Sequence, residues 1–376
     1  MKNLKVTLII SSLAGGGAEK VCVNVANGLA KIGWNVDLVV LNLKNSTYLF
    51  NVSKNVNLVE LKVNHTRYAM YSLLKYIYKN KPNLFLVFNY ELTVLIVLLR
   101  KLFRFKFKII SRNINTLSKK IEQLTQKFFS KYVVKFFINK FYCKADYIIC
   151  QCLGMRDDLI EFYPKLSSNL GVIYNPINEE VIKHARSNNI KIINKRDYLL
   201  CVGRLEKQKA FQYAIEAFAK ISEKFPTLRL KILGIGTQEE KLKNIAKNFG
   251  VIDRVDFEGF QKNIIPYYLY AKATLLTSLY EGFPNSLIES IKLGTPVISF
   301  DCPNGPAEII KDGVNGYLVK HKDVDDLKNK ILINMTNKFN IENMNFTVRK
   351  HDLKEVIQQY DKLLKSYNYN IHDEYN

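Results

Sequence analysis

The 376 residues are enough for two domains of ordinary size, and 48% apolar content is too high for a disordered chain. The net charge is +22, and the six cysteines have the spacing of neither a disulfide framework nor a zinc site. We expect no secretion signal and no membrane-spanning helix, because the longest apolar run, Leu92–Leu99, is far below the ~20 residues of a span.

The positive charge is concentrated in the first part of the chain. Residues 1–150 contain 24 Lys and Arg against 6 Asp and Glu, a net of +18, whereas the remainder has a net of only +4. This asymmetry predicts a polyanionic partner for the first half, whether nucleic acid, anionic lipid or a phosphorylated lipid. A general drift toward lysine in an AT-rich genome does not explain the balanced second half.

Short apolar runs alternate with helical patterns along the first half. The predicted strands are Val6–Ile10, Val36–Leu41, Leu84–Phe88, Phe107–Ser111, Tyr147–Cys150 and Val172–Ile173. The predicted helices are Ala18–Lys31, Glu91–Phe103 and Leu117–Tyr142. Such alternation is typical of a parallel sheet covered by helices on both faces.

The same alternation restarts in the second half, after a polar stretch, Lys183–Lys195, that we predict to be a linker. The predicted strands are Tyr198–Val202, Leu228–Leu233, Val255–Phe257, Ala273–Thr277 and Pro296–Phe300. The predicted helices are Phe211–Lys224, Gln238–Asn248 and about His351–Ser366. We therefore predict an α/β chain of two Rossmann-like, doubly wound domains, 1–176 and 177–349. Ligands bind beyond the carboxyl ends of such strands, so we expect a site in a central cleft that both domains face.

The first candidate site is Gly15-Gly16-Gly17, between the first predicted strand and a helix. Glycines allow close backbone approach, and a helix N-terminus attracts anions. A dinucleotide fingerprint would place its third glycine at Lys20 and an acid after the second strand, where Asn42 stands. We therefore reject a dehydrogenase, and a simple tight turn remains the alternative.

A second cluster, Val202–Lys209, follows the first strand of the second half. Its Arg204 and Lys209 lie five residues apart on a strand-to-helix turn. Arg offers a planar fork of donors and Lys a point charge, and together they suit a diphosphate. A solvated basic loop explains these two residues equally well.

The third cluster runs from Glu281 to Glu289. Pro284 and Asn285 suit a helix start, which places Glu281 in the loop and Glu289 about one turn inside the helix. A loop carboxylate can accept hydrogen bonds from sugar hydroxyls, and a helix carboxylate can hold a ribose. The intervening backbone is expected to face phosphates; it comprises Gly282, Phe283, Pro284, Asn285 and Ser286. The alternative is a pair of surface glutamates that flank a helix start.

Taken in order, these clusters resemble the family 4 retaining glycosyltransferases over almost the whole chain. The matching motifs are Gly16-Gly17-Ala18-Glu19, Val202–Leu205 with Lys209, Glu281–Glu289, Gly294–Ile298 and Asp312–Gly316. The resemblance implies the GT-B fold, with the last helix, about 350–376, crossing back onto the first domain.

The resemblance also implies roles for the charged residues. Arg204 and Lys209 would bind the donor diphosphate and stabilise the charge on the leaving group. Glu281 would bind the transferred sugar and act in catalysis, and Glu289 would bind the donor ribose. No protein nucleophile is implied, and the anomeric configuration would be retained.

In the first domain, the resemblance places Gly16 and Gly17 against the donor phosphates. Many family members carry a histidine after the fourth strand of this domain, where this chain has Ser111-Arg112-Asn113. None of the five histidines matches that position. We therefore assign no catalytic histidine and take Arg112 and Asn113 as candidates for acceptor binding.

The stretch Cys302–Glu308 is similar to members that transfer from UDP-N-acetylhexosamines or UDP-hexoses to lipid-linked oligosaccharides. We expect a UDP-sugar as substrate, no cofactor and no metal. The sequence Asp323-Val324-Asp325 matches a metal-binding D-x-D superficially, but it precedes a helical pattern. Asp323 is therefore predicted to be a helix cap.

Lysines and aromatic residues alternate along the predicted helix Leu117–Tyr142. Lys127, Lys131 and Lys135 recur every four residues and so share one helix face. We expect this face to dock on an anionic membrane, in which a polyprenyl-diphosphate-linked acceptor would be anchored. The protein would then be cytoplasmic and peripheral on the inner face of the membrane, acting in bacterial surface glycan synthesis. An ordinary covering helix with solvated lysines is the alternative.

The sequence argues against two other function classes. A sugar-nucleotide epimerase of the same fold needs a histidine–glutamate acid/base set, which the sequence does not offer. A nucleic-acid-binding protein is suggested by the pI near 9.5. However, no recognised nucleic-acid module is present and the basic excess avoids the Glu281–Glu289 cluster, so we expect no nucleic-acid partner.

Overall fold

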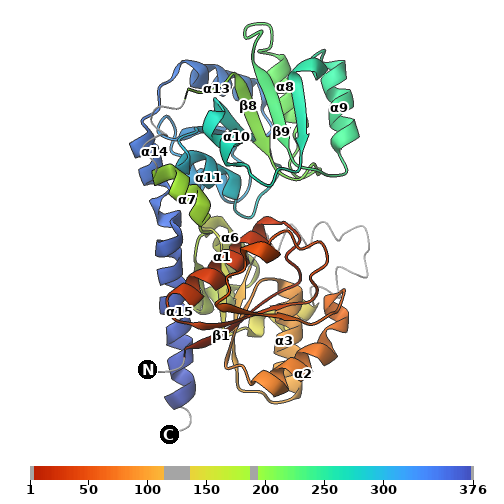
Figure 1. Cartoon of the computed structure of the whole chain (residues 1–376), viewed down its shortest axis with the longest axis vertical. Helices are drawn as coiled ribbons and strands as arrows, with labels where there is room; N and C mark the ends of the chain where they lie inside the picture. The colour runs from red at the N-terminus through yellow and green to blue at the C-terminus, as the bar shows by residue number, and fades with distance from the viewer. Residues whose placement is uncertain (1–3, 114–135, 187–193, 374–376) are drawn as a thin grey trace. The chain divides into compact units, whose positions relative to one another are not determined.

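The computed structural model describes residues 4–113, 136–186 and 194–373, with side chains of the last helix as far as Asn368. The chain divides into two compact units, shown in Figure 1. Unit 1 comprises residues 1–176 and 353–376, and unit 2 comprises residues 177–352. Most of the predicted helix 117–142, with Lys127, Lys131 and Lys135, lies outside the described residues.

Unit 1 is built on a seven-stranded parallel sheet in the order β3-β2-β1-β4-β5-β6-β7. The strands are β1 (Lys5–Ile10), β2 (Asn35–Val40), β3 (Val56–Glu60), β4 (Leu84–Val87), β5 (Lys108–Arg112), β6 (Tyr147–Cys150) and β7 (Leu170–Val172). The helices include α1 (Gly17–Lys31), α2 (Met70–Asn80), α3 (Tyr90–Leu102), α6 (Leu153–Phe162) and α15 (Leu353–Asp373). The strand order reverses between β1 and β4, so the loops that follow these two strands diverge at a ligand-binding switch point.

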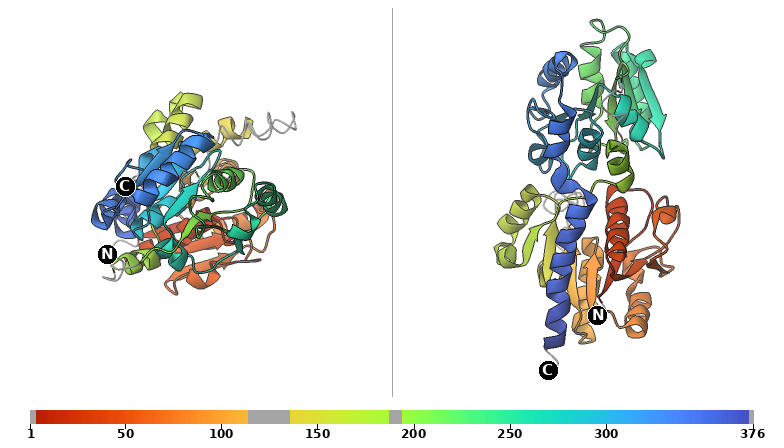
Figure 2. Two further views of the ribbon diagram at one scale, coloured as in Figure 1. Left: turned by 90° about the horizontal axis from the view of Figure 1, so that it is seen from above. Right: turned by 60° about the vertical axis from the view of Figure 1, so that its left-hand side comes forward.

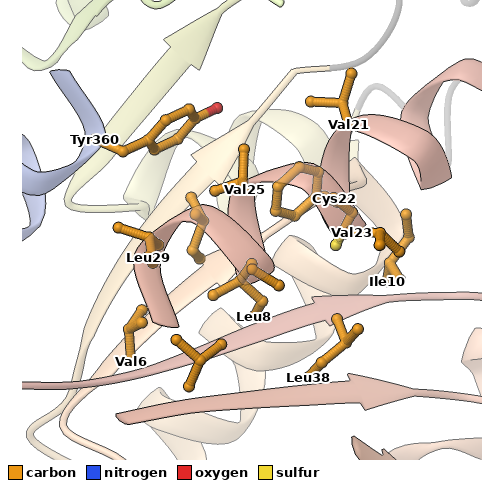
Figure 3. Close-up of a cluster of buried hydrophobic side chains, with 14 of the residues drawn as sticks. Val6, Leu8, Ile10, Val21, Cys22, Val23, Val25, Leu29, Leu38 and Tyr360 are labelled. Atoms are coloured by element: carbon orange, nitrogen blue, oxygen red, sulfur yellow. The ribbon is translucent and has the colours of Figure 1, made fainter. Parts of the chain in front are cut away.

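The core of unit 1 joins its first helix to its last. Figure 3 shows Val25 and Leu29 of α1 over Leu8 of β1, with Tyr360 of α15 in the same cluster. A Cβ atom on Gly28 would lie 2.5 Å from the Ile357 side chain, so the absence of a side chain there lets α15 pack directly on α1. The right-hand view of Figure 2 shows these two helices side by side.

A buried arginine links β5 to α15. The Arg112 side chain is 1% exposed, and its guanidinium donates to the Tyr360 hydroxyl at 2.5 Å and to Asn175 Oδ1 at 2.5 Å. We expect Tyr360→Phe to lower the free energy of unfolding by about 1–3 kcal/mol, because a buried charged donor loses its acceptor. Urea unfolding measures this loss, with Tyr71→Phe, at an exposed tyrosine of the same unit, as control. Equal effects of the two substitutions would contradict the assignment.

Unit 2 repeats the architecture with a six-stranded parallel sheet in the order β10-β9-β8-β11-β12-β13. The strands are β8 (Tyr198–Val202), β9 (Arg229–Leu233), β10 (Val255–Gly259), β11 (Ala273–Leu276), β12 (Val297–Phe300) and β13 (Gly316–Val319). The helices are α7 (Glu179–Arg186), α8 (Gln212–Ala219), α9 (Glu239–Asn248), α10 (Ile265–Tyr270), α11 (Asn285–Lys292), α12 (Pro306–Ile309), α13 (Val324–Thr336) and α14 (Ile341–Thr347). The order reverses between β8 and β11, which makes the carboxyl ends of these strands the switch point of this sheet.

The predicted linker Lys183–Lys195 is wrong at its start. Residues 183–186 form the end of α7, whose Val181 and Ile182 are buried. Only two apolar side chains are buried in this eight-residue helix, so its periodicity is too short to stand out from a polar stretch. Residues 187–193 lie outside the described part of the chain.

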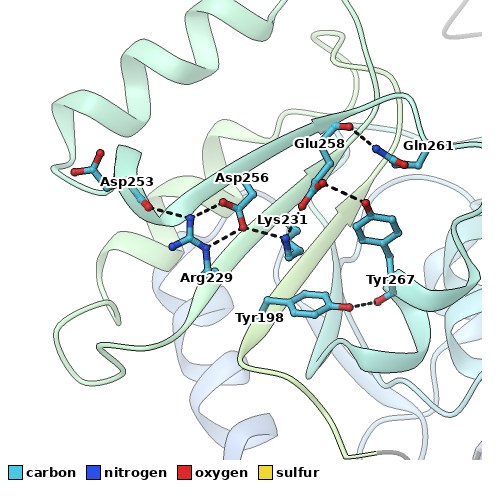
Figure 4. Close-up of polar contacts among 8 residues, drawn as sticks. All are labelled: Tyr198, Arg229, Lys231, Asp253, Asp256, Glu258, Gln261 and Tyr267. Carbon is cyan, nitrogen blue, oxygen red and sulfur yellow. Dashed lines mark hydrogen bonds and ion pairs between the residues drawn. The ribbon is translucent and has the colours of Figure 1, made fainter.

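Charges along the edge of the second sheet are paired with one another (Figure 4). Asp256 on β10 accepts a hydrogen bond from Arg229 at 2.9 Å and forms an ion pair with Lys231 at 3.1 Å, both from β9. The hydrogen bond from Arg229 contributes most to holding the pKa of the Asp256 carboxyl below its ordinary value. The cations at this edge are therefore neutralised by carboxylates on the next strand.

Lys195 is expected to make the stability of unit 2 depend on pH. Its amine donates to the Leu269 carbonyl oxygen at 2.8 Å and to Thr295 Oγ1 at 2.5 Å, yet burial lowers its pKa to about 8 from an ordinary 10.5. Between these values the unfolded chain binds more protons than the folded one, so stability from this site rises with pH. We expect Lys195→Met to lose that rise in urea unfolding from pH 8 to 10.5. The exposed Lys224→Met should keep it, and parallel curves for wild type and Lys195→Met would disprove the effect.

Candidate active site

The charged residues predicted for the donor site gather at the carboxyl edge of the second sheet. Arg204 and Lys209 follow β8, whereas Glu281 follows β11, the neighbouring strand in the sheet. Hydrogen bonds hold these loops together: Leu279 N donates to Gln208 O at 2.8 Å, Gln208 Nε2 to Tyr280 O at 2.9 Å, and Thr277 Oγ1 to Lys209 O at 3.1 Å. Residues about 70 positions apart in the chain are thus placed beside each other.

Lys209 and Glu281 form an ion pair with a distance of 2.6 Å between Nζ and Oε1. Ser278 Oγ donates to the same carboxylate oxygen at 2.6 Å. Glu281 is only 6% exposed, and burying a carboxylate is costly unless a cation and hydrogen bonds compensate it. Lys209 and Ser278 supply this compensation and fix the orientation of the carboxylate.

Backbone packing determines where Arg204 lies. A Cβ atom on Gly234, which has a φ of +139°, would lie 1.9 Å from the carbonyl oxygen of Gly203. The loops after β8 and β9 therefore meet backbone to backbone, and Leu205 N donates to Ile235 O at 3.0 Å. This contact holds the neighbouring Arg204 in place while its side chain stays exposed at the edge of the sheet.

The loop after β12 also packs against the loop that carries Glu281. Gly305 has a φ of +99°, and a Cβ atom there would lie 2.6 Å from Pro284 Cδ. Glu281 N donates to the Pro303 carbonyl oxygen at 3.1 Å. The stretch Cys302–Glu308, which carried the sub-family resemblance, thus shapes the turn that holds Glu281.

The helix that begins after this turn carries Glu289. As predicted, α11 starts at Asn285 with Pro284 as its N-cap residue, and Glu289 lies one turn inside. Glu289 is 4% exposed. The Ser290 hydroxyl lies 2.8 Å from the hydroxyl of Thr274 on β11, so the helix is anchored to the sheet at the residue next to Glu289.

The far end of α11 and its preceding turn contact the segment that closes unit 2. Lys292 forms an ion pair with Asp352 at 2.7 Å, and the Phe283 ring lies 5.2 Å from the His351 ring. The His351 carbonyl oxygen accepts a hydrogen bond from Ile177 N at 2.8 Å. The first and last residues of unit 2 are therefore tied together and held against the turn of Phe283.

In unit 1, the glycine cluster forms the start of α1. Gly16 is the N-cap residue and Gly17 the first helical residue. A Cβ atom on Gly16 would lie 2.3 Å from Glu19 Oε2, so the carboxylate of Glu19 approaches the helix N-terminus. A negatively charged side chain is favourable there because it faces the positive end of the helix dipole.

The two acceptor candidates differ in their surroundings. The Arg112 side chain donates hydrogen bonds to Tyr360 and Asn175, so it has a structural role in unit 1. Asn113 is 5% exposed, and its side-chain Nδ2 has no hydrogen-bond partner among the described residues. Its backbone carbonyl accepts from Gln151 Nε2 at 2.9 Å. Asn113 thus offers a buried donor at the carboxyl end of β5.

Sequence reasoning missed Ser278 and Gly305. Thr277-Ser278, a pair of small polar residues at the end of a buried strand, was the available signal for the first. Asn304-Gly305-Pro306 was the signal for the second, since a glycine between such residues marks a special backbone conformation.

The matches to known protein families cover both units. Residues 15–181 match the profile described as Glycosyltransferase Family 4, and residues 183–361 match that of Glycosyl transferases group 1. The chain belongs to glycosyltransferase family 4. It is an enzyme of the glycosyltransferase class with the GT-B fold, as the sequence predicted.

Among curated relatives of this glycosyltransferase is the N-acetylgalactosamine-N,N'-diacetylbacillosaminyl-diphospho-undecaprenol 4-alpha-N-acetylgalactosaminyltransferase of Campylobacter jejuni. It is 27% identical over 333 residues, which cover 84% of this chain and 86% of the relative. The lipopolysaccharide 1,6-galactosyltransferase of Salmonella typhimurium is 30% identical over 190 residues, 48% of this chain and 50% of the relative.

Solved structures of similar fold include Anabaena HepE in complex with UDP-glucose. Its TM-score is 0.78 at 18% identity, covering 96% of this chain and 100% of that chain. The galactosyltransferase WaaB of the lipopolysaccharide outer core has a TM-score of 0.72 at 21% identity, covering 96% and 99%.

Proposed function

We propose that this enzyme transfers a hexose or N-acetylhexosamine from a UDP-sugar to a lipid-linked saccharide, with retention of anomeric configuration, in bacterial surface glycan synthesis. The observation that carries the proposal is the cluster of Arg204, Lys209 and Glu281 at the carboxyl edge of the second sheet. It combines two cations for a diphosphate with a buried, oriented carboxylate for a sugar. The names of the Campylobacter and Salmonella relatives support the lipid-linked acceptor and the surface glycan.

The cations would stabilise the departing nucleoside diphosphate. The donor bond breaks between the anomeric carbon and the diphosphate oxygen, and negative charge develops on that oxygen. Arg204 can donate two parallel hydrogen bonds to two oxygens of the diphosphate and Lys209 a third to the leaving oxygen, and charge-assisted bonds of this kind are the stronger ones. Lys209 would then divide its three donors between the diphosphate and Glu281.

Glu281 is a poor candidate for a nucleophile. One of its oxygens already accepts hydrogen bonds from Lys209 and Ser278, which lower the electron density that a nucleophile must supply. We therefore assign it to binding the transferred sugar. The acceptor hydroxyl would attack the anomeric carbon from the face that the diphosphate leaves, and a leaving phosphate oxygen would take the hydroxyl proton.

Binding of the rest of the donor would fall to α11 and its turn. Glu289 would accept hydrogen bonds from the two ribose hydroxyls, and the backbone from Gly282 to Ser286 would face the phosphates. On the acceptor side, Asn113 offers the buried side-chain donor described above.

We expect transfer to need no divalent metal. Asp323 caps α13, since its Oδ1 accepts from Asp326 N at 3.0 Å, and Asp325 forms an ion pair with Lys220 at 2.9 Å. Both carboxylates of the D-x-D sequence are thus engaged, and cations of the protein can take the place of a metal at the diphosphate. Activity should persist in excess EDTA; complete loss that magnesium or manganese restores would refute this expectation.

A thermal-shift panel of nucleotide sugars tests the proposed donor. A ligand that binds only the folded state raises the melting temperature by mass action. UDP and one UDP-sugar should stabilise the protein, whereas GDP- and ADP-sugars should not. NMR of the product formed from that donor on a polyprenyl-diphosphate saccharide then gives the anomeric configuration; an inverted product would refute retention.

A further inference from the structure

A flank of unit 1 combines exposed aromatic and aliphatic side chains with unpaired cations. Residues 61–113 contain 11 Lys and Arg but a single acid, Glu91. The structure places many of these cations on two neighbouring segments, α2 and the residues that follow α3. We call this surface the α2 flank and define it by Tyr71, Lys75, Tyr78, Leu102, Phe103 and Arg104.

The apolar side chains of the α2 flank are exposed to an unusual degree. Tyr71 is 77% exposed and Tyr78 56%; they are seven residues apart and therefore share one face of α2. Leu102 is 57% exposed and Phe103 38%. The Tyr78 ring lies 5.3 Å from that of Phe105, so the helix and the segment after α3 form one continuous surface.

The cations of this flank lack carboxylate partners. Lys75 and Arg104, and the adjacent Lys79 and Lys101, form no ion pair within the described part of the chain. The edge of the second sheet shows the contrast, because Arg229 and Lys231 each pair with an acid on the adjoining strand. The positive potential of the α2 flank is therefore available to an external anion.

We infer that the α2 flank is a docking surface for an anionic lipid bilayer. Exposed tyrosine and lysine side chains are characteristic of the zone between lipid headgroups and water, and Leu102 and Phe103 would insert below it. A second copy of the chain would bring two positive surfaces together, which is unfavourable. Nucleic acid would leave Leu102 without an apolar partner.

The orientation of α2 suits the proposed acceptor. The helix follows β3 and precedes β4, so it runs from the carboxyl edge of the first sheet to its amino edge. Ligands bind beyond the carboxyl edge, and Tyr71 lies near that end of the helix. A bilayer along α2 would thus reach the edge where a lipid-linked saccharide enters. This inference deepens the proposed function and rests on it for the acceptor, but not for the binding to lipid.

Sedimentation of the full chain with vesicles tests the inference. The vesicles contain phosphatidylethanolamine alone or with an increasing share of phosphatidylglycerol. We expect binding to rise with phosphatidylglycerol and to fall at least about tenfold in Lys75→Glu/Arg104→Glu, because two attractive charges become repulsive. Tyr78→Ser/Phe103→Ser should weaken binding at every lipid composition. The matched control is Lys224→Glu/Lys247→Glu, the same charge change at exposed positions of unit 2, which should bind much more tightly than the flank variant.

Thermal unfolding midpoints equal to that of wild type show that the variants fold. Vesicle binding that does not depend on lipid charge would overturn the inference. Vesicle binding that the flank substitutions leave unchanged would overturn it as well. So would release by Lys127→Glu/Lys131→Glu/Lys135→Glu together with normal binding of the flank variants, because docking would then use that other segment. Flank-dependent self-association or RNA binding without vesicle binding would also overturn it. Vesicle binding that depends on the flank, in a protein that no UDP-sugar stabilises, would support the inference while refuting the proposed function.

Discussion

Replacing Arg204 with alanine is expected to remove most of the thermal stabilisation that UDP gives the wild-type protein. The loop that carries Arg204 is fixed by the contact between Gly203 and Gly234, so the backbone at Arg204 is held in place before a ligand binds. A hydrogen bond to a charged group contributes about 1.5–3 kcal/mol, and the loss corresponds to roughly a ten- to hundredfold weaker complex.

Melting temperatures recorded along a UDP titration measure this effect. Lys224→Ala is the matched control, since it removes one exposed cation from the same unit at a distance in sequence from every donor-site motif. Arg204→Ala should melt like wild type in the absence of UDP. If UDP stabilised wild type and Arg204→Ala equally, Arg204 would have no part in donor binding.

Replacing the two glutamates is expected to separate turnover from UDP affinity. Glu289→Ala should weaken UDP binding by about ten- to a hundredfold, because the ribose loses a charged acceptor. Glu281→Ala should lower turnover far more than it lowers UDP affinity, because its carboxylate would contact the transferred sugar, which UDP lacks. Lys209, released from its ion pair, would remain available to the diphosphate.

Isothermal titration of UDP against both variants, with turnover of the donor found in the thermal-shift panel, provides the measurement. Glu281→Gln refines the test, since it keeps the shape of the side chain and the acceptor for Ser278 but removes the charge that faces Lys209. Unchanged UDP affinity in Glu289→Ala would disprove its ribose role. An equal loss of affinity and turnover in Glu281→Ala would count against its contact with the sugar.

The sequence predicted the two parallel sheets because most of their strands are fully buried apolar runs. The two strands that it missed both lie at a sheet edge: β3 buries only Val56, and β13 begins with a glycine and leaves Leu318 partly exposed. The start of α11 was predictable because Pro284 and Asn285 carry local information about a helix start. Local signals of this kind need no knowledge of the tertiary structure.

Contacts between residues far apart in the chain could not be predicted from the sequence. Lys209 and Glu281 were both assigned to the donor, but their ion pair depends on β8 and β11 being neighbours, which only the strand order reveals. Arg112 was predicted to be an acceptor-site residue because it stands in the stretch where many family members carry a histidine. Its partner Tyr360 comes from a helix 248 positions later, so burial of the guanidinium could not be foreseen.

The division of unit 1 into two segments has a consequence for its synthesis on the ribosome. Residues 177–352 are translated after most of unit 1 and before α15, which supplies Val356, Ile357, Tyr360 and Leu364 to the core of that unit. At roughly 5–20 residues per second, this interval lasts on the order of 10–35 s. During this interval the surface of α1 around Gly28 is exposed to water, and Arg112 lacks the Tyr360 hydroxyl that accepts its hydrogen bond. Nascent unit 1 therefore exposes this apolar surface until α15 is made, whereas unit 2, encoded without interruption, can bury its core as soon as it emerges.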